Sequence, residues 1–135
     1  MSEFIHRIHS KSGSLLAYVI RRDFSADITS FVTPPEHNFQ VGFVVHPKDG
    51  EIQSHYHRKI DRKISNTSEV LVVREGHCEI DIYDDDQLLV ETLEMKAGDV
   101  MVMVSGGHGF RMVENTVFLE IKQGPYIGID EKKRF

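Results

Sequence analysis

Two histidines, His55 and His57, are separated by a single residue, and this spacing is suited to metal chemistry. On an extended strand, side chains two positions apart point to the same face. Neutral imidazole is a common metal ligand, so two imidazoles on one face form half of a coordination site. We therefore expect residues 51–57 to form a strand that presents both histidines together.

Two later residues are candidates for the other half of the site. Glu69 opens a long apolar segment, and His108 follows the glycine-rich turn at residues 105–107. Three imidazoles and one carboxylate suit a divalent transition metal such as iron, manganese, nickel or zinc. On a six-coordinate ion they would leave two positions for water or a bidentate ligand. A His-x-His pattern also occurs without a metal, so the spacing alone leaves a structural role open.

Short apolar or alternating segments, separated by turn residues, are expected to position these side chains. Strands are predicted over residues 15–22, 38–46, 51–57, 69–74, 77–83, 87–93, 100–104, 109–113 and 116–122. Residues 1–13 allow either a helix or a strand, and residues 58–68 are polar enough to predict a loop. About eight or nine short strands with frequent turns indicate an all-β sandwich or barrel.

Length and composition restrict the class of protein. A chain of 135 residues suits one domain, and a net charge of -5 argues against a general nucleic-acid binder. The apolar runs are too short for a membrane span, and the start lacks the apolar core of a signal peptide, so a cytoplasmic protein is expected. The single cysteine, Cys78, excludes an internal disulfide and is predicted to lie in the core.

The residues around the candidate ligands resemble the two sequence motifs of the cupin superfamily. The first motif contains a glycine, His-x-His, a glutamate and a second glycine, which correspond here to Gly50, His55, His57, Glu69 and Gly76. The second motif contains two glycines and a histidine, which correspond to Gly98, Gly106 and His108. The resemblance covers about residues 39–121, which is most of the chain.

This resemblance implies a single cupin domain with a jelly-roll barrel, also called a double-stranded β-helix. Its core would span about residues 39–122, with an N-terminal arm at 1–37 and a C-terminal tail at 123–135. The resemblance implies that His55, His57, Glu69 and His108 bind one divalent metal ion. It also implies a homodimer, which agrees with the two-sided apolar segment at residues 70–73.

The resemblance leaves several activities open, because one fold supports many reactions. We expect binding of, or action on, a small anionic or polyhydroxylated metabolite that is sugar-related in one interpretation. As an enzyme, the protein would be a metal-dependent isomerase or epimerase, a lyase, or an iron-dependent dioxygenase. The alternative is a non-catalytic cupin that binds or senses a small ligand.

The sequence departs from the family motifs at several positions. Eleven residues separate His57 from Glu69 where the family has three or four, so residues 58–68 are interpreted as an insertion. Val104 stands where the family has proline, the spacing from there to His108 is one residue short, and the asparagine that follows in the family is absent. Glu69 is therefore assigned by its six-residue distance to Gly76.

The inserted loop is rich in positive charge. Four cations accompany one anion, Asp61, and at the mouth of a barrel they could bind a carboxylate, phosphate or sulfate. A solvated loop or a salt-bridged dimer contact is the alternative. The candidate ligand-binding residues are Arg58, Arg62 and Lys63 from this loop, and Phe110, which shares its strand face with His108 and is expected to form a wall of the cavity.

Overall fold

The computed structural model describes residues 3–128 and 131–135. Two positions of the predicted N-terminal segment, 1–2, and two positions of the predicted tail, 129–130, lie outside the described residues. The chain divides into two compact units, Met1–Phe24 with Thr67–Phe135, and Ser25–Asn66. The regular structure consists of antiparallel β-strands, so the predicted all-β class is confirmed. No helix of the described residues is both long and apolar enough to span a membrane.

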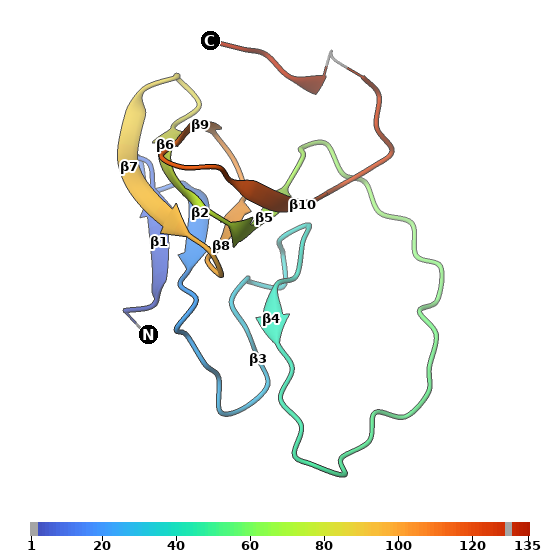
Figure 1. Ribbon diagram of the computed structural model, residues 1–135. Coiled ribbons are helices and arrows are strands. Elements are labelled where there is room, and N and C mark those ends of the chain that lie inside the picture. Colours follow the sequence, from blue (N-terminus) through green and yellow to red (C-terminus); the bar gives the residue numbers. More distant parts are fainter. Residues whose placement is uncertain (1–2, 129–130) are drawn as a thin grey trace. The chain divides into compact units, whose positions relative to one another are not determined.

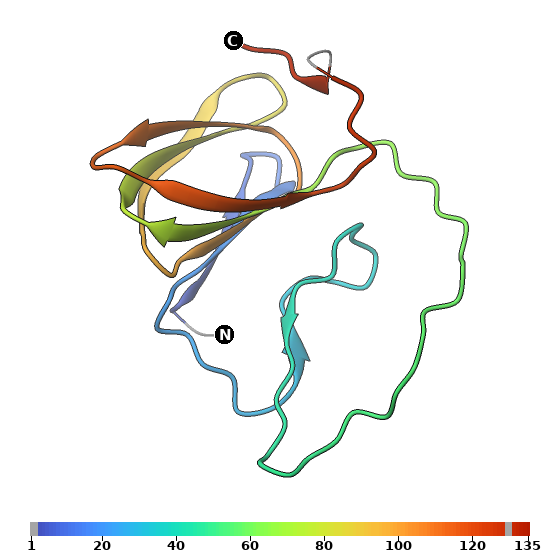
Figure 2. The ribbon, with the colours of Figure 1, turned by 45° about the vertical axis from the view of Figure 1, so that its right-hand side comes forward.

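The first unit contains two antiparallel sheets, which face each other (Figures 1 and 2). The larger sheet has the order β1 (Ile5–His9), β2 (Leu15–Ile20), β8 (Val100–Met103), β5 (Glu69–Glu75) and β10 (Val117–Lys122). The smaller sheet has the order β7 (Leu89–Lys96), β6 (His77–Tyr83) and β9 (Gly107–Met112). The described strands thus form separate sheets and no closed barrel, because β10 and β9 remain edge strands.

An apolar core fills the space between these two sheets. The larger sheet contributes the buried side chains Ile8, Leu16, Ala17, Val19, Leu71, Val73, Met101 and Met103, and the smaller sheet contributes Cys78, Ile80, Ile82 and Met95. Strand residues alternate between two faces, so the odd-numbered positions of β5 and the even-numbered positions of β6 face this core. Each fully buried aliphatic side chain contributes about 1.5–3 kcal/mol to folding. The predicted core position of Cys78 is confirmed.

Gly76 connects the two sheets, since it lies between the end of β5 and the start of β6. Its φ angle of +96° lies in the left-handed region, which favours glycine. A Cβ atom at this position would also lie 2.2 Å from the carbonyl oxygen of Asn115. Both observations explain why the chain changes sheets at a glycine.

Polar contacts join the sheets along the side formed by β1 and β7. The His6 Nε2 and Glu91 Oε2 atoms are 2.7 Å apart, and they belong to the edge strands of the two sheets. The buried Asp99 carboxylate accepts hydrogen bonds from the backbone amides of Arg22 and Lys96, at 2.8 and 2.9 Å. This side of the sandwich is therefore closed by side chains, whereas β9 and β10 form the opposite edges.

The second unit contains one short hairpin, made of β3 (Ser30–Phe31) and β4 (Gly42–Phe43). The Thr33 hydroxyl accepts a hydrogen bond from the amide of Val41 at 2.9 Å and holds the hairpin loop. Residues 51–65 have no regular secondary structure. The loop predicted over residues 58–68 is therefore confirmed as far as residue 65, whereas the strand predicted over residues 51–57 is wrong. The strand predicted over 38–46 is reduced to two residues. An apolar pattern indicates where a strand is possible, but a strand also needs a partner for its amide and carbonyl groups.

Candidate functional site

In the first unit, the buried Glu69 contacts the exposed His108. Glu69 begins β5 on the face that carries Leu71 and Val73, and His108 lies on β9 opposite Ile82, another core residue. The His108 Nε2 and Glu69 Oε2 atoms are 3.4 Å apart, and the Glu69 residue is only 8% exposed. The sequence prediction that these two distant residues come together is therefore matched by a contact between the two sheets.

The surroundings of Glu69 favour its ionised form. The hydrogen bond with His108 lowers the pKa of the Glu69 carboxyl below its ordinary value, although burial acts in the opposite direction. The positive charges of Lys122 and Lys132 lower the pKa further. A carboxylate that stays negative inside the sandwich is suited to bind a cation.

Aromatic rings extend this site along the space between the edge strands. The Phe110 ring lies 5.7 Å from the His108 ring and 5.3 Å from the Phe118 ring, measured between centroids. Phe110 is partly buried against the core, as its shared face with His108 predicts. We call Glu69, His108, Phe110, Phe118 and Lys122 the inter-sheet cluster.

Lys122 enters this cluster through the register of β10. Lys122 pairs with Glu69, and Glu120 pairs with Leu71, so both side chains share the inward face of the sheet. Of these two residues, Lys122 is half-buried, whereas Glu120 is exposed. Alternation shows which residues share a face, but only the register shows which face is inside.

The predicted histidine pair lies in the second unit. The His55 and His57 rings are 5.3 Å apart between centroids, with an angle of 68° between their planes. The His55 Nδ1 atom is 2.9 Å from the Gln53 carbonyl oxygen. Both histidines are exposed, and Tyr56 between them is 82% exposed. The two imidazoles are thus neighbours although the segment that carries them is not a strand.

The four predicted ligands therefore form two pairs, one in each unit. Within residues 3–128 and 131–135, no three or more His, Cys, Asp or Glu side chains are grouped closely enough to hold a metal ion. Each pair nevertheless has the donor chemistry of a divalent-metal site, since carboxylate and imidazole both bind such ions. The ionised state of Glu69 fits this role, and the four-ligand site stays a prediction.

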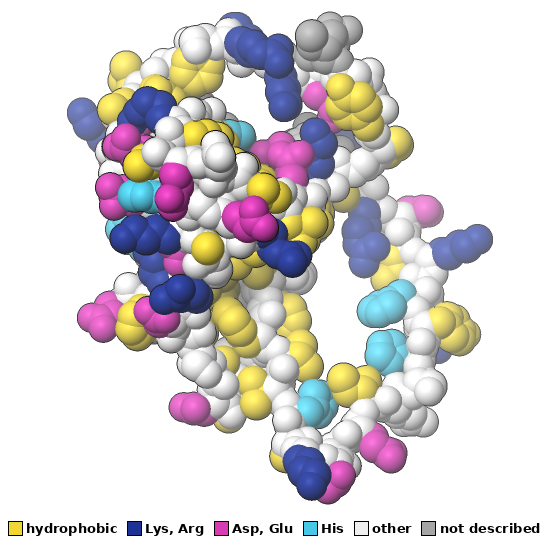
Figure 3. Space-filling view, in the orientation of Figure 1, with side chains coloured by type: hydrophobic (Ala, Val, Ile, Leu, Met, Phe, Trp, Pro, Cys, Tyr) yellow, Lys and Arg dark blue, Asp and Glu magenta, His cyan; other side chains and the backbone are white. Residues whose placement is uncertain are grey.

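The predicted basic loop is exposed, which is compatible with both a ligand-binding loop and a solvated loop. Arg58, Arg62 and Lys63 are all exposed and lie outside regular structure. Figure 3 shows that, on the face in view, acidic and basic side chains are interspersed over the strands of the first unit. The anion-binding role of the loop stays a prediction, as do the homodimer and the cytoplasmic location.

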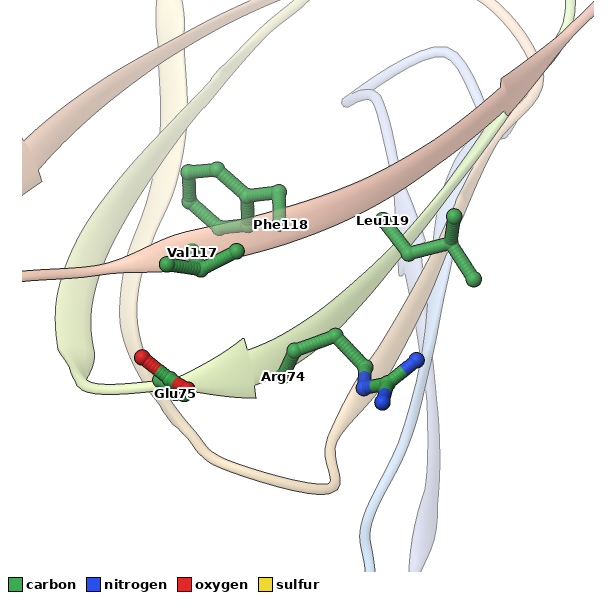
Figure 4. Close-up of a pocket in the computed structure, with 5 residues that line it drawn as sticks. All are labelled: Arg74, Glu75, Val117, Phe118 and Leu119. Atoms are coloured by element: carbon green, nitrogen blue, oxygen red, sulfur yellow. The ribbon is translucent and has the colours of Figure 1, made fainter.

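A surface hollow of about 310 Å³ lies at the far end of β5 and the start of β10 (Figure 4). It is lined by Arg74, Glu75, Val117, Phe118 and Leu119. This lining is mostly apolar, with one guanidinium and one carboxylate, and it contains none of the predicted ligands. The inter-sheet cluster therefore carries more reactive chemistry than this hollow.

Comparisons of the chain with protein-family models, with curated proteins and with solved structures found no significant match.

Proposed function

We propose that the protein is a cupin-type jelly-roll protein that binds one divalent transition-metal ion. Its ligands would be Glu69 and His108, together with the sequence-assigned pair His55 and His57. The observation that supports this proposal most is the contact between the buried, ionised Glu69 and the solvent-accessible His108. Burial of a carboxylate is costly unless the charge is compensated, and a metal ion compensates carboxylate and imidazole together.

The small molecule proposed to bind at this metal site is an anionic or polyhydroxylated metabolite. When bound, a divalent ion polarises carbonyl or hydroxyl oxygens and can activate water. The chain itself contributes Phe110 and Phe118, whose rings form an apolar wall beside His108. Arg58, Arg62 and Lys63 would supply positive charge for an anionic group.

Metal content and affinity test this function directly. Protein purified without a histidine tag is analysed by elemental mass spectrometry and titrated with iron(II), manganese, nickel and zinc. We expect about one ion per chain in the wild type. Loss of an outer-shell partner weakens metal binding by about 10- to 100-fold. Glu69→Gln and His108→Ala each remove a proposed ligand and should weaken metal binding by more than this. His55→Ala and His57→Ala should do the same.

His9→Ala is the matched control, because His9 is an exposed histidine on β1 and is not a predicted ligand. This control should keep the wild-type metal affinity. A wild-type protein that binds none of the four ions would refute the proposal. Loss of metal in the Glu69 and His108 variants but not in the His55 and His57 variants would limit the ligands to the first unit.

A further inference from the structure

Lys122 is the charged member of the inter-sheet cluster that is not a proposed metal ligand. Its backbone pairs with that of Glu69, so the two side chains lie on the same inward face of neighbouring strands. The residue is half-buried, and its ammonium group lies 5.3 Å from the centre of the Tyr126 ring. This places one positive charge beside the proposed metal ligand, at a position determined by strand pairing.

The role of this charge depends on what Glu69 binds. Without a metal ion, the Glu69 carboxylate partly compensates the Lys122 ammonium. When Glu69 binds a metal ion, its charge is shared with that ion, so Lys122 keeps its positive charge available for another anion. A lysine ammonium binds carboxylate and phosphate groups as a compact point charge.

The apolar neighbours make this position favourable for a ligand. Phe118 lies on the same face of β10 as Lys122, and its ring contacts that of Phe110. The aromatic ring beside the ammonium group itself is that of Tyr126, at 5.3 Å. A small ligand would thus meet an apolar wall and an ammonium group within one site.

We propose that Lys122 binds the anionic group of a small carboxylate or phosphate ligand whose other oxygen atoms are held by the metal ion. This inference rests on the proposed metal-binding function. It differs from the predicted role of the basic loop, because Lys122 is fixed on a paired strand of the first unit. In this proposal, Lys122 on β10 recognises the negative charge of the bound small molecule.

Calorimetric titrations of the metal-loaded protein test this assignment. The probes are oxalate and inorganic phosphate, which separate a carboxylate from a phosphate preference, and imidazole, a neutral metal ligand. Lys122→Met should weaken binding of the preferred anion by at least about tenfold, whereas Lys122→Arg should retain most of the affinity. Imidazole should bind Lys122→Met as it binds the wild type. Lys11→Met, in the exposed turn between β1 and β2, removes an equal charge and should change nothing.

Metal titration of the same variants tests the role of Lys122 separately from the proposed metal-binding function. We expect Lys122→Met to bind the metal ion at least as tightly as the wild type, since a nearby positive charge is removed. Unchanged binding of both anions by Lys122→Met would overturn the role of Lys122 while leaving the metal site intact. Equal losses for the anions and imidazole would also overturn it, because the metal itself would then be disturbed. A wild type without metal affinity would refute both proposals before any anion is added.

Discussion

Asp81 links the three strands of the smaller sheet through its side chain. Its carboxylate accepts hydrogen bonds from Thr92 on β7, at 2.6 Å, and from Arg111 on β9. The hydrogen bond from Arg111 is the largest cause that holds the pKa of Asp81 below its ordinary value of 3.8. A residue on the central strand β6 thus fastens both neighbouring strands by charge as well as by backbone pairing.

Asp81→Asn should lower the free energy of unfolding at pH 7 by about 1–2 kcal/mol. The lower part of the range for charged hydrogen bonds applies because the Arg111 side chain is 54% exposed and solvent screens it. Since folding lowers the pKa of Asp81, its contribution is complete above the unfolded pKa near 4 and is lost as pH falls through the folded value. The difference between wild type and variant should therefore shrink from pH 7 to pH 3 in urea unfolding.

Asp85→Asn serves as the control for this experiment, because Asp85 is exposed in the turn after β6. It should change the stability by less than about 0.5 kcal/mol at either pH. A pH-independent loss in Asp81→Asn would show that Asp81 acts through the number of its acceptor oxygens and not through its charge.

At the scale of elements, the passage from β5 to β6 depends on Gly76. Gly76→Ala should lower the free energy of unfolding by more than about 2 kcal/mol, because a left-handed φ costs an alanine about 1–2 kcal/mol and the new Cβ also meets the Asn115 carbonyl. Gly13→Ala provides a comparison, since Gly13 has a similar φ of +92° with nothing within 4 Å of the added atom. Chemical denaturation of both variants measures the two costs.

The difference between these two variants isolates the steric contact from the backbone conformation. We expect Gly13→Ala to lose only the conformational part, about 1–2 kcal/mol. Equal losses in the two variants would mean that the chain near Asn115 moves aside without cost, and would contradict a tight connection between the sheets.

The elements that the sequence predicted well are those with a clear alternation and a strand partner. The strand over residues 77–83 has the predicted bounds, because Cys78, Ile80 and Ile82 alternate with polar residues between evident turns. The first strand could not be distinguished from a helix, because Phe4, Ile5 and Ile8 fit both periods. The strand over residues 51–57 was wrong, since alternation does not show whether a partner exists.

At the scale of the whole molecule, the sequence predicted part of the candidate site. It selected Glu69 from one segment and His108 and Phe110 from another, and His108 contacts both of the other two residues. It did not place Lys122 or Phe118 beside them, because their inward orientation depends on the register between β10 and β5. The ring of Phe135, in the C-terminal tail, lies 5.0 Å from that of Tyr83, a contact that no local pattern indicates.

The single thiol of the chain lies between the two sheets. Cys78 is 0% exposed on the central strand of the smaller sheet, and burial raises the pKa of its thiol, so little reactive thiolate is present in the folded protein. We expect a thiol-reactive disulfide reagent to label Cys78 only after the sandwich opens. The free energy of opening calculated from the labelling rate should equal the free energy of unfolding measured in urea. Rapid labelling without denaturant would contradict this expectation.

The core position of Cys78 therefore gives the molecule an internal reporter of its own opening. One covalent reaction, at one sulfur atom, counts how often the two sheets separate, without an added dye or an engineered residue. The same count, taken with and without metal ions, would show whether a bound ion keeps the sandwich shut.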